Sequence, residues 1–128
     1  MNQTINFRKT LSELKRYLEL PVLNNRDRAG IIQAFEFTFE QCWKTLQKVA
    51  GSQGIQIGNP KAAFKYAMAN GWIPSSEETQ WLELLKDRNL TSHTYEELLA
   101  RQVLERIQNF YVGMFEALLS AIDRETLG

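Results

Sequence analysis

Hydrophobic residues recur every three or four positions along most of this chain, a spacing that predicts amphipathic helices. A first helix is predicted over residues 4–19, where one apolar stripe is formed by Phe7, Leu11, Leu14 and Leu18. A second is predicted over residues 27–50, with a broad apolar face formed by Ile31, Ile32, Phe35, Phe39, Cys42, Trp43, Leu46 and Val49. Pro21 lies between the two helices, and Gly51 follows the second.

A short third helix is predicted over residues 61–70. Asn59 supplies an N-cap and Pro60 occupies the first helical position, where its missing N–H costs nothing. Gly71 then ends the helix, because glycine readily adopts the backbone conformation of a helix C-terminus.

Two capping-box patterns predict where the last two helices begin. Ser75 and Glu78 form the first, at the start of a fourth helix. Thr94 and Glu97 form the second, so the last helix is predicted over residues 95–123. Its inner apolar stripe is expected to comprise Leu99, Val103, Ile107, Phe110, Met114, Leu118 and Ile122.

Together these elements predict an all-α fold. The sequence shows no alternation typical of strands, no internal repeat and no low-complexity tract. Four long helices and one short helix, joined by short links, indicate an antiparallel four-helix bundle with one additional short helix. With 128 residues, 44% of them hydrophobic, the chain suits a single domain over residues 1–128.

Composition narrows the function classes. The formal net charge is zero, whereas a protein that holds RNA on a broad basic surface carries a cationic excess. Cys42 is the only cysteine and there is a single histidine, so neither a disulfide framework nor a metal site is expected, and no cofactor is predicted. The N-terminus lacks the order of a signal peptide and no apolar run could span a membrane, which predicts a cytoplasmic protein.

The second predicted helix carries two features outside its main apolar face. Phe37 lies roughly opposite Phe35, so either a neighbouring helix or a partner subunit is expected to cover it. Glu36 and Glu40 lie one turn apart at the edge of the apolar face, and Glu40 can pair with Lys44. A solvated acidic face explains Glu40, whereas Glu36 is expected to pair with Arg88 or to order a partner surface.

The residues between the fourth and fifth helices carry the candidate chemistry. The segment contains Arg88, His93 and Tyr95, at a corner between two helices. Arginine is a permanent cation whose planar fork matches phosphate oxygens, and imidazole can donate or accept a proton near neutral pH. A simpler interpretation is that these basic groups only complement the negative end of the fourth helix.

A family resemblance favours the phosphate interpretation. The spacing Arg88-x4-His93-x-Tyr95 resembles the R-x4-H-x-Y motif of the HEPN superfamily, small helical domains named for nucleotide binding in higher eukaryotes and prokaryotes. The run from Phe35 to Lys44 is similar to a helix motif of one branch, the nucleotidyltransferase substrate-binding proteins close to the HepT-like toxins. The resemblance extends over nearly the whole chain, with the two motifs in the expected order.

This resemblance implies a homodimer and a metal-independent endoribonuclease. His93 would serve as general acid or base, and Arg88 would stabilise charge on the reacting phosphate. Asn89 would hydrogen-bond the phosphate or orient His93, and Glu36 would help to form the binding site. One histidine per chain is a poor supply for a reaction that needs both an acid and a base, which is a physical reason to expect two copies.

The resemblance also implies a partner. In related two-gene systems a minimal nucleotidyltransferase, encoded nearby, silences the toxin by transferring AMP to the motif tyrosine, here Tyr95. The chain itself has no nucleotidyltransferase signature, so it is not the transferring enzyme. The alternative is a non-catalytic subunit that binds a nucleotide or substrate for a nucleotidyltransferase, and a third hypothesis is a helical adaptor whose corner only packs.

Overall fold

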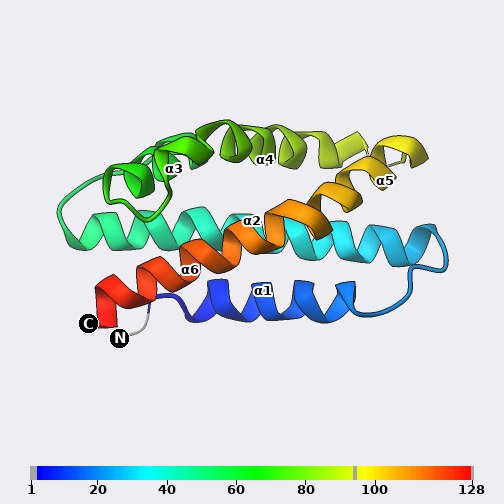
Figure 1. Cartoon of the computed structure of the whole chain (residues 1–128), viewed down its shortest axis with the longest axis horizontal. Coiled ribbons are helices and arrows are strands. Elements are labelled where there is room, and N and C mark those ends of the chain that lie inside the picture. Colours follow the sequence, from blue (N-terminus) through cyan, green and yellow to red (C-terminus); the bar gives the residue numbers. More distant parts are fainter. Residues whose placement is uncertain (1–2, 94, 128) are drawn as a thin grey trace.

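The computed structural model describes residues 3–93 and 95–127, and within them six α-helices follow one another (Figure 1). They are α1 (Ile5–Leu18), α2 (Asn25–Ser52), α3 (Pro60–Ala69), α4 (Glu78–Leu90), α5 (Glu97–Arg106) and α6 (Val112–Leu127). Two 3₁₀ turns, Ser75–Glu77 and Thr91–His93, precede and follow α4, and a π-helical turn, Ile107–Tyr111, joins α5 to α6.

Successive long helices run antiparallel around α2, as Figure 1 shows. Helix α1 packs along α2 and α6, and α3 and α5 also contact α2. Because α5, the π turn and α6 form one rod, the molecule has four long helical rods and the short α3. The predicted all-α bundle is therefore confirmed.

Aromatic side chains fill the centre of the bundle. Phe35 of α2 stacks on Tyr111 with 5.8 Å between ring centroids, and Phe115 of α6 meets Phe7 of α1 edge-on at 5.9 Å. Trp81 of α4 also contacts Phe115, so all four long rods reach the same cluster. All five side chains are buried, and each contributes roughly 1.5–3 kcal/mol or more through removal from water.

Helix ends follow the predicted caps in part. The Asn59 side chain accepts a hydrogen bond from the backbone N–H of Ala62 at 2.9 Å, with Pro60 at the first helical position, as predicted. The predicted Ser75–Glu78 capping box is wrong, because residues 75–77 form a 3₁₀ turn without a side-chain cap and α4 begins only at Glu78. The predicted cap at Thr94 lies outside the described residues.

The last rod departs from the predicted continuous helix over residues 95–123. Its α-helical part starts at Glu97, and the π turn over Ile107–Tyr111 interrupts it. One extra residue in a turn rotates the following side chains by about 100° relative to an unbroken α-helix. Phe110, predicted to face inward, is consequently 59% exposed, while Tyr111 is buried.

One large apolar side chain of α2 is exposed at the surface. Phe37 is 56% exposed, so no neighbouring helix in the described part of the chain packs over it. Of the two expectations for Phe37, coverage within the monomer is therefore excluded. Within residues 3–93 and 95–127, no helix combines the length and apolar character needed to cross a bilayer.

Candidate functional site

The corner between α4 and α5 exists as predicted. Helix α4 ends at Leu90, and the 3₁₀ turn Thr91–His93 leads toward α5. Trp81 and Leu84 of α4 are buried, and Arg88, one turn further along the same face, is half-buried. The final turn of a helix is electrostatically favourable for a cation, which suits Arg88 to this position.

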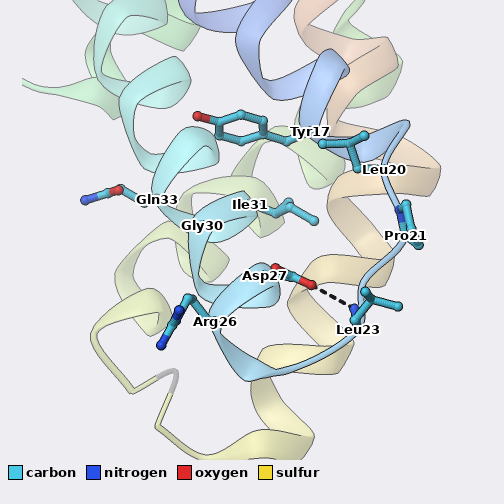
Figure 2. Close-up of a pocket in the computed structure, with 9 residues that line it drawn as sticks. All are labelled: Tyr17, Leu20, Pro21, Leu23, Arg26, Asp27, Gly30, Ile31 and Gln33. Atoms are coloured by element: carbon cyan, nitrogen blue, oxygen red, sulfur yellow. Dashed lines mark hydrogen bonds between the residues drawn. The ribbon is translucent and has the colours of Figure 1, made fainter.

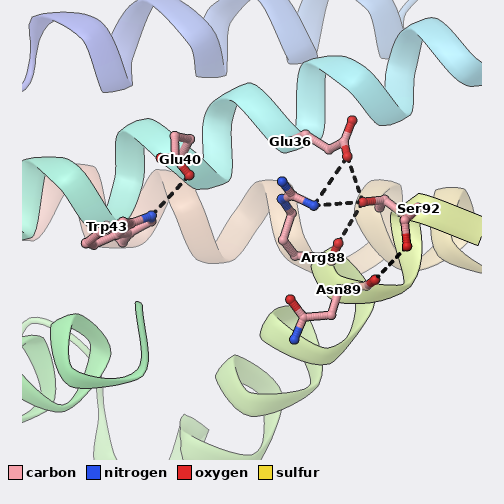
Figure 3. A network of polar contacts seen from close by, with 7 residues as sticks. Glu36, Glu40, Trp43, Arg88, Asn89 and Ser92 are labelled. Atoms are coloured by element: carbon pink, nitrogen blue, oxygen red, sulfur yellow. Dashed lines mark hydrogen bonds and ion pairs between the residues drawn. The ribbon is translucent and has the colours of Figure 1, made fainter. Parts of the chain in front are cut away.

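Arg88, Glu36 and Thr91 form a three-residue polar cluster, and Figure 3 shows the Arg88 side chain pointing toward Glu36. Nη1 of Arg88 lies 3.3 Å from Oε2 of Glu36 and donates a hydrogen bond to Oγ1 of Thr91 at 3.1 Å. The Thr91 hydroxyl lies 2.7 Å from Oε2 of Glu36 and 2.6 Å from the backbone carbonyl oxygen of Arg88. Since that hydroxyl has one proton, it donates to one of these two oxygens at a time.

The cluster connects α2 to the corner while remaining reachable. The side chains of Arg88 and Glu36 are 33% and 31% exposed, so a ligand can approach the guanidinium from solvent. The guanidinium also lies over the Phe39 ring, 5.9 Å from its centroid, which restricts its orientation. The expected pairing of Glu36 with Arg88 is thus present, and Thr91 joins it although sequence reasoning did not single Thr91 out.

Glu40 extends this polar edge along α2. Its carboxylate accepts a hydrogen bond from Nε1 of Trp43 at 3.2 Å and pairs with Nζ of Lys44 at 3.2 Å, as expected for Lys44. Burial opposes ionisation of the carboxylate, but the bonds to Trp43 and Lys44 outweigh it and hold the pKa of Glu40 below its ordinary value. Glu40 is therefore an ionised, already paired group beside the cluster.

His93 and Tyr95 form a separate, exposed pair. Nδ1 of His93 lies 3.4 Å from the Tyr95 hydroxyl, and their rings meet edge-on with centroids 6.0 Å apart. Tyr95 is 78% exposed and His93 is also exposed. Among the described residues, no hydrogen bond or ion pair joins this pair to Arg88. The corner therefore presents a held cation and, beyond it, an accessible imidazole and phenol.

Asn89 stands apart from both groups. Its side chain is exposed, and its backbone carbonyl oxygen accepts a hydrogen bond from the Ser92 hydroxyl at 3.3 Å. In Figure 3 its amide points away from Glu36. No hydrogen bond within the described residues links that amide to His93, so the expected orienting contact is not formed.

A partly buried ion pair lies on the α5 side of the corner. Asp87 of α4 accepts two hydrogen bonds from Arg106, at 2.6 Å from Nε and 2.9 Å from Nη2, and a third from the Tyr111 hydroxyl. Hydrogen bonding to Asp87 raises the pKa of Arg106 above its ordinary value, so the guanidinium stays charged. Burial and then the Asp87 carboxylate raise the pKa of Tyr111, so the phenol stays neutral. This network fixes the end of α4 against the rod formed by α5 and the π turn.

Two hollows flank α2 near the corner end of the molecule. One, of about 480 Å³, lies between the end of α1 and the start of α2 and contains none of the motif residues (Figure 2). The other, of about 260 Å³, is bordered by Tyr95 itself. Within the described residues no group of three or more histidine, cysteine, aspartate or glutamate side chains is arranged to hold a metal ion.

Comparison with known proteins identifies the family. The model of the family described as nucleotidyltransferase substrate binding protein like matches residues 2–124. The chain therefore belongs to this family.

Two solved structures share the fold. The chain is 34% identical to a protein from Thermus thermophilus with a TM-score of 0.80, over 89% of this chain and 96% of that one. It is 22% identical to a Haemophilus influenzae protein with a TM-score of 0.77, over 94% of this chain and 98% of that one. The structure of the Haemophilus protein is described as revealing the fold of a substrate binding domain of a nucleotidyltransferase. A search of curated protein sequences found no match.

Proposed function

We propose that this chain is the HEPN subunit of a two-component minimal nucleotidyltransferase system and acts as a metal-independent endoribonuclease. The supporting observation is the geometry of the corner. A permanent cation, Arg88, is held by Glu36 and Thr91 but stays open to solvent, and an exposed imidazole follows it in the adjoining 3₁₀ turn. An imidazole for proton transfer and a cation for the charge on the phosphate are the two kinds of group that serve cleavage of RNA by its own 2′-hydroxyl.

In the proposed reaction the RNA 2′-oxygen attacks the adjacent phosphorus and the bond from phosphorus to the 5′-oxygen breaks. The products are a 2′,3′-cyclic phosphate and a 5′-hydroxyl. A base removes the 2′-proton, and an acid gives a proton to the leaving 5′-oxygen. Arg88 stabilises the negative charge that grows on the phosphate oxygens, while Glu36 and Thr91 hold its guanidinium in place. Asn89, exposed in the last turn of α4, is proposed to turn toward the bound RNA and donate a further hydrogen bond to the phosphate.

Each chain supplies one imidazole, so a homodimer is proposed to supply the acid and the base. Phe37, exposed on α2 directly beside Glu36, is the apolar side chain proposed to lie in the interface. Analytical ultracentrifugation at micromolar concentration is expected to show a dimer. Replacing Phe37 with aspartate is expected to weaken it by about 2 kcal/mol, which is roughly 30-fold in the dissociation constant.

Ile55 provides the matched control for the dimer experiment. It is 44% exposed in the link between α2 and α3, at the opposite end of the molecule from the corner (Figure 1). Ile55→Asp is expected to leave the dimer unchanged. A wild-type monomer at micromolar concentration would contradict the proposed dimer.

Tyr95 is proposed as the point of control by the partner nucleotidyltransferase. Its hydroxyl is exposed and lies 3.4 Å from Nδ1 of His93. A nucleotide transferred to that hydroxyl would therefore stand against the imidazole and block its approach to RNA. This accounts for a toxin that is silenced without unfolding.

The ribonuclease proposal is tested by incubating end-labelled RNA with the purified protein in a metal chelator. Mass spectrometry must first show that Tyr95 carries no added nucleotide, because a silenced toxin is expected to be inert. Cleavage by the unmodified protein is expected. A folded, unmodified dimer that leaves RNA intact would overturn the ribonuclease activity.

A second candidate is a non-catalytic subunit that binds a nucleotide or substrate for the partner enzyme. Two observations favour it: Arg88 is already paired with Glu36, and the chain has no net charge with which to attract RNA. The family description agrees with this role. Co-purification with the nucleotidyltransferase, together with intact RNA in the chelator experiment, is the result that this candidate predicts.

A further inference from the structure

The cavity bordered by Tyr95 has no part in the mechanism above. It measures about 260 Å³ and lies between the first turns of α2 and the start of α5. Ile32 and Ala100, both buried, give it an apolar base. Its remaining lining residues are Asn25, Arg28, Ala29, Tyr95 and Glu97.

The charge in this cavity is effectively positive. Glu97 is already paired with Arg101, at 2.5 Å between Oε1 and Nη2. Arg28 is half-buried, and in the described part of the chain no carboxylate lies within ion-pair distance of it. Its Nη1 donates a hydrogen bond to Oδ1 of Asn25 at 2.5 Å, which leaves further guanidinium donors for a ligand. An anion is the expected ligand, and a planar guanidinium fork matches phosphate oxygens best.

The other walls suit a flat ring. Ala29 and Ala100 have small side chains, and the exposed ring of Tyr95 offers a surface on which a base can stack. A volume of about 260 Å³ lies just below the range typical of sites for drug-sized ligands, so the cavity suits one nucleotide at most.

The cavity is next to the corner and separate from it. Arg28 precedes Glu36 by two turns on α2, which is about 12 Å along the helix axis. A ligand phosphate at Arg28 would thus lie beside the Arg88 cluster without displacing Glu36. Ile32, one turn from each, separates the two positions.

We propose that this cavity binds a single nucleotide, with its phosphate on Arg28 and its base against Tyr95. The nucleotide is one residue of the RNA substrate, because transfer of AMP to Tyr95 would place the phosphorus on the Tyr95 hydroxyl oxygen instead of on Arg28. The role given to this nucleotide rests on the proposed function above. The binding itself is independent of it and is tested without RNA or partner.

Binding is measured by titrating the full unmodified chain with AMP, adenosine and inorganic phosphate while following backbone amide signals by NMR. AMP is expected to shift signals from residues 25–32 and 95–100, and adenosine and phosphate are each expected to bind more weakly. Replacing Arg28 with glutamine is expected to weaken AMP binding about tenfold or more, through loss of charge-assisted hydrogen bonds.

Arg26→Gln is the matched control, because Arg26 is exposed on the same turn of α2 but lines the other hollow. It is expected to change AMP binding by less than about twofold, since only long-range attraction is lost. Absence of AMP-induced shifts around the cavity, or equal losses in the two variants, would overturn the nucleotide site.

The role of the nucleotide is tested with the same Arg28→Gln variant. A raised KM for RNA with an unchanged kcat is expected and assigns the cavity to the substrate. An unchanged KM overturns this assignment, even if transfer of AMP to Tyr95 by the partner becomes slower. A wild-type chain that binds AMP but never cleaves RNA would instead refute the ribonuclease and leave the nucleotide site standing.

Discussion

Replacement of His93 by alanine is expected to lower the rate of RNA cleavage by about 10²–10⁴-fold, the usual contribution of a general acid or base. The side chain is exposed and its one described polar contact is with the Tyr95 hydroxyl, so the free energy of unfolding is expected to change little. The measurement pairs single-turnover cleavage rates with chemical denaturation of the same samples.

Ser92→Ala is the control for this experiment. Ser92 is exposed in the same 3₁₀ turn and bonds only to the backbone carbonyl of Asn89 among the described residues. It is expected to keep the wild-type rate within about twofold, because its hydroxyl has no part in the proton transfers. Equal rates for wild type and His93→Ala would remove the imidazole from the mechanism.

Replacement of Asp87 by alanine is expected to destabilise the fold by about 2–4 kcal/mol, because the buried Tyr111 hydroxyl loses its acceptor and the half-buried Arg106 loses its carboxylate. The Asp87 side chain is 3% exposed. Equilibrium unfolding in urea measures the change.

Glu83→Ala is the matched acidic control. Glu83 is 55% exposed and its oxygen lies 3.8 Å from Nε of Arg106, so its loss is expected to cost less than about 1 kcal/mol. If Asp87→Ala also lowers the free energy of unfolding by less than about 1 kcal/mol, the network does not hold α4 against the last rod.

The helices and their apolar faces were predictable because periodicity reports burial directly. Phe7, Leu11 and Leu14 of α1 are buried as their spacing predicts, and the Asn59-Pro60 start of α3 follows from local capping chemistry. Phe110 was placed wrongly, since the pattern fits an unbroken α-helix and the π turn depends on tertiary contacts. Tyr111 is turned inward there, onto Phe35 and Asp87.

The candidate site also contains residues that the sequence predicts and residues that only the fold brings together. Arg88, His93 and Tyr95 were selected by their types and spacing, and the edge position of Glu36 indicated its contact with Arg88. Thr91 was missed because its role depends on how the 3₁₀ turn folds back toward α2. Asp87 and Arg106 are nineteen positions apart, and only the packing of α4 on the last rod brings them together.

The central claim is that the corner formed by Arg88 and His93 cleaves RNA through attack of the 2′-hydroxyl. Its most direct test is the chemical identity of the ends that the unmodified protein leaves on RNA in the presence of chelator. The mechanism predicts 2′,3′-cyclic phosphate and 5′-hydroxyl ends, because the nucleophile comes from the RNA itself. Products with 3′-hydroxyl and 5′-phosphate ends would require water as the nucleophile and would contradict it.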